Sequence, residues 1–300
     1  MVRLAHTVVL APVPRPWLVD ALGVLMDLAE SSRTEAGYVL LPDGRELPDL
    51  RLVEGRHLRP GAVYESVAKD AGDTGDTDDT ERTDRTHGTE RTDPTDGTSD
   101  TGYAEGDVRA AAGETVRVTV EEWRRTRALR LAVAASAPDG VLSAHAVLRG
   151  PDRPDLVELT GRARIENVWS ALSRPSGDAV LRCEDWWTAA DRGRPARKAP
   201  LRVRLTCGIA RAELVVLPRP ARENDGWEVR VTARLRGRGP LRPVTALALR
   251  LFRRPLARAW GRGLDDFAAQ WNTEVPQLTA LGPEDLRREI LPEPEPDLEP

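Results

Sequence analysis

A strict alternation of apolar and polar residues through the second half of the chain limits its possible folds more than any other feature. Between Trp227 and Leu235 every second residue is apolar, and the residues between them are Glu, Arg or Thr. Weaker stretches of the same period lie at 116–120, 129–133, 141–148, 159–169, 179–187 and 201–217. Successive side chains of a strand point to opposite faces. The pattern therefore predicts an antiparallel sheet with one buried face and one solvated face.

Beyond Pro243 the spacing of apolar residues changes from two to mostly three and four, which is typical of a helix. These positions are Leu247, Leu251, Leu256, Trp260, Leu264, Phe267 and Trp271. The spacing predicts an amphipathic helix of about thirty residues that packs on the sheet, with a kink or break at Pro255. A shorter helix is expected at 283–290, followed by a Pro/Glu-rich tail.

Before the alternating region the chain predicts a small strand–helix unit. An apolar strand is expected at 4–11, a helix at 17–29, and short extended pieces at 38–41, 50–53 and 62–67. Residues 72–102 then contain no aliphatic or aromatic residue and no Ala, Met or Cys. A segment with nothing to bury is expected to be disordered, because burial cannot offset the entropy cost of ordering it.

These observations predict one domain with an insertion. The residues before the insertion are too few to bury a core alone, so 1–70 is assigned as the N-terminal strand–helix part of a single domain. Residues 71–112 are the acidic Thr/Asp-rich insertion, and 113–275 are the main sheet and C-terminal helix of the same domain. Residues 276–300 are the short helix and tail. The predicted class is α+β, an antiparallel sheet gripping a long C-terminal amphipathic helix.

This order of elements resembles the START-like, helix-grip fold of the polyketide cyclase and lipid-transfer superfamily. The resemblance is carried by the strand and Gly/Pro turn at 227–243 leading into the final helix, and by His6-Thr-Val-Val-Leu-Ala-Pro before the helix at Trp17. It implies a cavity between sheet and helix that binds a hydrophobic small molecule or lipid, with transfer of that ligand as an extension. Five aromatic residues are expected to line the cavity: Trp169, Trp186, Trp227, Trp260 and Phe267.

An enzymatic alternative, a polyketide cyclase or dehydratase, depends on a few titratable residues. His145 lies on an expected strand, and Glu184 and Asp185 adjoin Cys183 and two tryptophans on another. A carboxylate in an apolar pocket has a raised pKa and can act as a general acid or base. No spacing indicates a catalytic triad or a metal site, and no cofactor is expected.

A second alternative is a non-catalytic interaction module with a basic face. The net charge of −4 combines about −9 in residues 71–107 and about −5 in residues 283–300, so the rest of the chain is strongly basic. Arginines gather at 124–127, 234–238 and 250–254 without a nucleic-acid motif, so no specific nucleic acid is expected. Peripheral contact with an anionic membrane remains an open alternative. No signal peptide or membrane span is recognised, which predicts a cytoplasmic protein.

Overall fold

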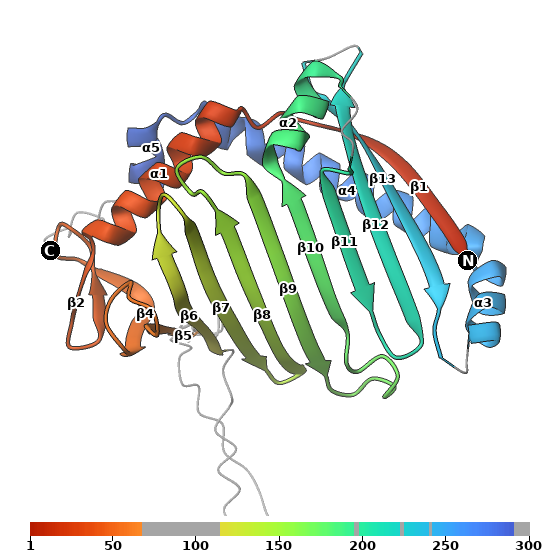
Figure 1. Cartoon of the computed structure of the whole chain (residues 1–300), viewed down its shortest axis with the longest axis horizontal. Helices are drawn as coiled ribbons and strands as arrows, with labels where there is room; N and C mark the ends of the chain where they lie inside the picture. Colours follow the sequence, from red (N-terminus) through yellow and green to blue (C-terminus); the bar gives the residue numbers. More distant parts are fainter. Residues whose placement is uncertain (68–114, 195–197, 223–224, 240–241, 291–300) are drawn as a thin grey trace, which may run out of the picture.

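The fold is α+β: an antiparallel sheet packs against a long C-terminal helix, as the alternating and helical periods predict (Figure 1). The computed structural model describes residues 1–290 apart from 68–114, 195–197, 223–224 and 240–241. Its strands are β1 (Val2–Leu10), β2 (Arg33–Glu35), β3 (Tyr38–Leu40), β4 (Glu46–Glu54), β5 (Val63–Val67), β6 (Thr115–Arg124), β7 (Ala128–Ala137), β8 (Gly140–Arg149), β9 (Leu156–Ile165), β10 (Ser176–Arg182), β11 (Leu201–Thr206), β12 (Ala210–Pro220) and β13 (Trp227–Gly237). Its helices are α1 (Arg15–Ser31), α2 (Cys183–Arg192), α3 (Arg242–Leu251), α4 (Arg253–Ala280) and α5 (Pro283–Ile290).

The described strands form one 13-stranded sheet with a simple connectivity. From β2 to β13 each strand pairs with the next along the chain, and β1 completes the sheet by pairing with β13. Val2 lies opposite Leu235 and Leu10 opposite Trp227, so the chain's first strand lies beside its last. The insertion 71–112, predicted to be disordered, lies within residues 68–114, which fall outside the described residues. The strands on either side of it are paired neighbours, with Val67 opposite Thr115.

The pairing register gives the sheet one apolar face across most of its width. Val8 of β1 lies opposite Val229 of β13, and Val229 lies opposite Pro218 of β12, so these three side chains share one face. The same face continues through Leu201 and Leu181 to β9. Helix α4 lies along β1, α2 lies on β12, and α3 contacts β13. One buried core therefore lies at the β1–β13–β12 end, where Val229 and Ala233 are each only 2% exposed, and a second lies at the β3–β6 end around Val39, Ala62 and Val120.

Residues 183–187 correct one expectation, because they belong to a helix. Strand β10 ends at Arg182 and α2 begins at Cys183. Glu184 and Asp185 fall in the first helical turn, where negative charge is favourable to the helix dipole. Gly193 ends the helix in the left-handed conformation that glycine adopts at little cost. These local signals, and not the apolar alternation, determine the structure here.

Two further boundaries differ from the prediction. The single strand expected at 201–217 is a hairpin, β11 and β12, whose turn includes Gly208. A side chain at Gly208 would meet the backbone oxygen of Ala171 at 2.7 Å, so this close approach requires glycine. The C-terminal helix divides at Phe252, three residues before Pro255, and continues through Pro276 to Ala280. The short helix predicted at 283–290 is confirmed as α5.

Candidate functional site

The apolar face of the sheet is only partly covered by helices. In its centre, four large apolar side chains from neighbouring strands share this face according to the pairing register. They are between 38% and 47% exposed: Leu142, Leu159, Ile165 and Leu205. At the β1–β13 end, by contrast, the helices bury the same face almost completely. An uncovered apolar area therefore continues directly from the covered core.

Three of the five predicted ligand-binding aromatics belong to the apolar cluster at the covered end of this face. Trp186 of α2 packs edge-on against Trp227 of β13, with ring centroids 5.8 Å apart. Trp260 of α4 packs against the same apolar cluster. The indole nitrogen of Trp227 donates to Asp191 at 2.9 Å. The Nε1 atom of Trp260 is buried and has no hydrogen-bond acceptor within the described residues.

The other two predicted aromatics lie away from this cluster. Trp169 is in the connection between β9 and β10 and is 59% exposed. Phe267 is on α4 and is 48% exposed, with its ring centroid 5.7 Å from that of Trp271. Trp271 instead faces β1, where its indole nitrogen donates to the backbone oxygen of Ala11 at 2.9 Å. Helical spacing alone could not distinguish Trp271, which contacts the end of β1, from Phe267, which is exposed.

The residues considered for acid–base catalysis lie on opposite sides of the sheet. Glu184 is exposed on α2 and forms an ion pair with Arg15 at 2.6 Å. Asp185 is half-buried on the same helix, which packs on the apolar face. His145 is exposed on the polar face, where its Nδ1 lies 3.1 Å from a carboxylate oxygen of Glu121. The structure therefore does not bring His145 together with the two carboxylates.

Cys183, next to those carboxylates, is not an activated nucleophile. Its side chain is buried, and its backbone nitrogen donates to the backbone oxygen of Asp155 at 2.9 Å. Burial, and secondarily the negative charge of Asp155, raise the pKa of the Cys183 thiol to about 11. Since the thiolate is the reactive form, this cysteine is inert near neutral pH.

The polar face of the sheet carries a groove lined mainly by arginine. Its arginines come from strands β11 to β13 and from the residues that follow β13: Arg204, Arg211, Arg234, Arg236, Arg238 and Arg242. Glu213 is the one carboxylate in this lining. A second groove, which includes His145, shares Arg204 and Thr206 with it. The sequence indicated the arginines at 234–238, but Arg204 and Arg211 join them only through the strand register.

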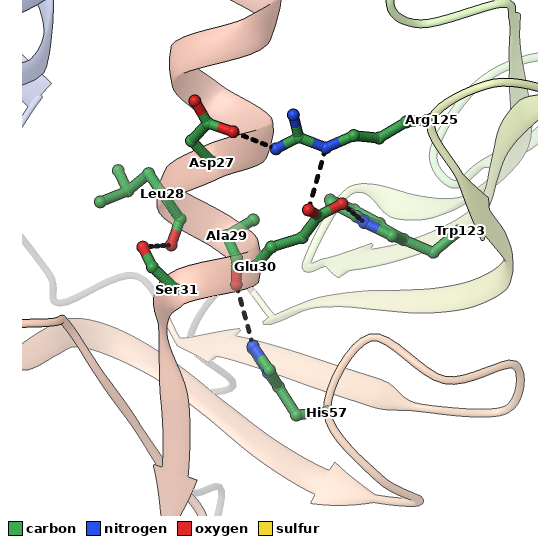
Figure 2. Close-up of polar contacts among 8 residues, drawn as sticks. All are labelled: Asp27, Leu28, Ala29, Glu30, Ser31, His57, Trp123 and Arg125. Carbon is green, nitrogen blue, oxygen red and sulfur yellow. Dashed lines mark hydrogen bonds and ion pairs between the residues drawn. The ribbon is translucent and has the colours of Figure 1, made fainter.

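A polar cluster fastens the C-terminal end of α1 to the sheet (Figure 2). Arg125, in the turn between β6 and β7, forms ion pairs with Asp27 and, at 2.9 Å, with Glu30. Trp123 also donates to Glu30, at 3.0 Å. The ring Nε2 of His57 lies 3.1 Å from the backbone oxygen of Ala29, one of the last carbonyls of α1. These contacts satisfy the end of a helix, which is a structural role.

Neither a metal-binding cluster nor a membrane-spanning helix occurs among the described residues. No group of three or more His, Cys, Asp or Glu side chains there could hold a metal ion. None of the helices in this part of the chain is long and apolar enough to cross a membrane.

Comparison with known proteins adds no assignment. No family model, no curated protein and no solved structure matches this chain. By its structure the chain is an α+β protein, with a 13-stranded antiparallel sheet in the described residues and a C-terminal helix on the apolar face of that sheet.

Proposed function

We propose that this protein binds a hydrophobic small molecule or lipid between the apolar face of the sheet and the C-terminal helix. The arrangement that supports this is similar to the helix-grip fold of START-like proteins. A first strand pairs with the last, an antiparallel meander lies between them, and a long helix follows. The meander here is longer, with 13 strands in the described sheet.

The observation that carries the proposal is the uncovered apolar area of the sheet. Contiguous exposed apolar surface on a folded protein marks a ligand groove or an interaction site. Leu159 and Leu205 are 46% and 47% exposed on this face. Covering a side chain that is half-exposed contributes about 1 kcal/mol, half the value for complete burial of a leucine. An apolar ligand spread over several such residues gains enough free energy to bind.

The buried indole nitrogen of Trp260 supports a ligand with one polar end. A buried donor without an acceptor costs about 1–3 kcal/mol, and Trp260 Nε1 has no acceptor within the described residues. A carbonyl, hydroxyl or carboxylate oxygen of a ligand would remove this cost. Fatty acids and many polyketides combine such an oxygen with an apolar body. A ligand of that class fits both observations.

The test combines ligand recovery with titration. Native mass spectrometry of the protein purified from its source is expected to detect a co-purifying apolar molecule. In titrations with a fluorescent fatty acid, the double variant Leu159→Ser/Leu205→Ser is expected to bind at least about tenfold more weakly. Leu217→Ser is the matched control, because Leu217 is 43% exposed on the opposite face of the sheet.

Trp260→Phe isolates the polar contribution to binding. It keeps an aromatic ring in the cluster and removes the N–H, so fatty-acid affinity is expected to fall about tenfold while the free energy of unfolding does not decrease. The proposal is wrong if no apolar molecule co-purifies and the fatty acid fails to bind. It is equally wrong if the fatty acid binds the sheet-face variant as tightly as the unaltered chain.

The cyclase alternative gains less support from the geometry. His145 and the carboxylates of Glu184 and Asp185 lie on opposite sides of the sheet. A cyclase needs an acid and a base that reach one substrate, and these three residues do not form such a pair. Binding without catalysis is therefore the proposal for this fold.

A further inference from the structure

Helix α3 is apolar on two sides, although only one side contacts the rest of the protein. On its inner side Leu249 packs against the cluster of Val2, Leu4 and Ala233. On its outer side, and at the residue that separates α3 from α4, a row of large apolar side chains faces solvent. These are Val244, Leu247, Leu251 and Phe252, with exposed fractions of 64%, 69%, 74% and 59%. We call these four residues the outer stripe.

The outer stripe has the spacing of a helical face. Val244, Leu247 and Leu251 follow one another at intervals of three and four residues, so they lie on one side of α3. Single exposed leucines are ordinary, but an apolar row more than half exposed along a whole helix is not. Such a helix is stable in water only because its inner side is buried. Its outer side is available to an apolar environment.

Positive charge surrounds the outer stripe. From Arg242 to Arg254 the chain contains four arginines and no acidic residue. Arg250 and Arg253 line one groove with Met1, Arg3 and Leu247. This groove adjoins the arginine-lined groove of the polar face, since Met1 and Ala246 belong to both. Arg242, Arg250 and Arg253 form no ion pair with a carboxylate in the part of the chain that the structure describes.

We propose that α3 and the start of α4 dock this protein on an anionic membrane surface. The outer stripe enters the boundary between headgroups and acyl chains, and the surrounding arginines contact lipid phosphates. An amphipathic helix with an apolar stripe and basic flanks lies in the membrane interface in this way. At ten residues α3 is too short to span a bilayer. Figure 1 shows it at one end of the molecule, beside the N-terminus and remote from α1 and α5.

Charge complementarity favours a membrane over two other occupants. A nucleic acid would pair with the arginines, but its phosphates would leave the outer stripe without an apolar partner. A second copy of this chain in a two-fold contact would place the same patch against itself. Arg250 and Arg253 would then approach the same residues of the other copy with no acidic residue between 242 and 254 to balance them. An anionic lipid surface offers acyl chains to the outer stripe and phosphates to the arginines.

The experiment is vesicle flotation of the full chain with phosphatidylcholine vesicles that contain or lack phosphatidylglycerol. The unaltered protein is expected to bind the anionic vesicles and to bind neutral ones weakly. Leu247→Ser/Leu251→Ser is expected to reduce the binding constant at least tenfold. Arg250→Gln and Arg253→Gln are each expected to reduce it about fivefold, because one basic residue near an anionic surface contributes about 1 kcal/mol.

The sheet-face variant Leu159→Ser/Leu205→Ser is the control, and it separates this proposal from the proposed function. It is expected to bind vesicles like the unaltered chain, while the α3 variants are expected to bind the fluorescent fatty acid normally. Circular dichroism verifies that each variant keeps its fold. Membrane docking through α3 is refuted if the Leu247→Ser/Leu251→Ser protein floats with anionic vesicles as well as the unaltered protein does.

Three other results would also overturn the proposal. Equal binding to neutral and anionic vesicles would exclude the role of the arginines. A dimer that the two leucine substitutions dissociate, measured by light scattering, would assign the outer stripe to contact between copies. Tight binding to single-stranded RNA together with no binding to either vesicle would assign the arginines to nucleic acid.

Discussion

At the scale of single residues, the environment of Cys183 illustrates how burial overrides a helix terminus. As the first residue of α2 it occupies a position where helix dipoles stabilise a thiolate. Its side chain is only 4% exposed, however, and it lies near the carboxylate of Asp155. The net result is a pKa of about 11 instead of the ordinary 9.0. Desolvation of the charged form is the larger of the two opposing effects.

Cys183 is therefore expected to resist alkylation in the native protein. With iodoacetamide at pH 8, peptide mapping by mass spectrometry should find Cys207 modified and Cys183 unmodified, whereas both react in guanidinium chloride. Because the folded-state pKa is the higher one, the neutral thiol stabilises the fold below about pH 9, and this contribution is lost as the pH rises through about 11. Native-state alkylation of Cys183 at pH 8 at the rate of the denatured chain would contradict this account.

At the scale of elements, the contact between α4 and β1 protects one edge of the sheet. Asn272 accepts a hydrogen bond from the backbone nitrogen of Ala11 at 2.7 Å and donates to the backbone oxygen of Val9 at 2.9 Å. One amide side chain thus satisfies two backbone groups beside the outer edge of β1, as a neighbouring strand would. Unpaired edges of this kind are sites of aggregation.

Asn272→Ala is expected to reduce the free energy of unfolding by about 1–3 kcal/mol, because it leaves these backbone groups without a partner. Urea denaturation measures the loss, and light scattering is expected to detect more aggregation. Gln270→Ala is the matched control: among the described residues, the side chain of Gln270 bonds only to Glu274, one turn away on the same helix, at 2.9 Å. Its effect should remain within about 0.5 kcal/mol. Equal losses in the two variants would show that Asn272 does not protect the edge.

The sequence predicts the elements better than it predicts their boundaries and neighbours. Alternation identifies β13 and most of the meander, since one face of the sheet is buried and the other is wet. Residues 183–187 show the limit: two tryptophans and a cysteine fit a buried strand as well as a helix, and the acidic first turn and Gly193 decide between them. Periodicity alone does not separate the two for short apolar runs.

The apolar spacing of residues 243–271 contains a change of helix face that bears on the candidate sites. In a continuous helix, at about 100° per residue, Leu247 and Leu251 would lie about 140° and 180° from Trp260, because the step from Leu251 to Leu256 is five residues. In the structure Leu247 and Leu251 of α3 face solvent, while Trp260 of α4 packs against the core. Pro255 falls in the first turn of α4, where its missing N–H has no intrahelical partner to lose, so the helix divides at Phe252, just before that turn. The five-residue step between Leu251 and Leu256, and not the break, is therefore the sequence signal for the outer stripe.

At the scale of the whole molecule, β5 and β6 are paired neighbours that flank residues 68–114. Val67 and Thr115 are direct partners, so a short turn is enough to connect them. Replacing residues 71–112 with an Asn-Gly turn is therefore expected to keep the fold. It should raise the free energy of unfolding by about 1–2 kcal/mol, because a shorter loop costs less entropy to close.

Urea denaturation measures this change, and a variant with residues 71–112 in scrambled order is the control. Because the scrambled variant keeps the length and composition, it should unfold like the unaltered chain. Two separate unfolding transitions in the shortened protein would mean that the parts before and after the segment fold independently. A single transition at higher urea agrees with one cooperative sheet.

The pairing of β1 with β13 also determines when the protein can fold during synthesis. The strands from β2 onward can each pair with a neighbour soon after leaving the ribosome, but β1 has no partner until residue 237 has been made. At about 5–20 residues per second, this delay is roughly 10–45 s. Throughout it, the apolar residues Val2, Leu4 and Val8 remain uncovered on the nascent chain. The residues of β1 are thus translated before every other strand of the described sheet but are among the last that can fold.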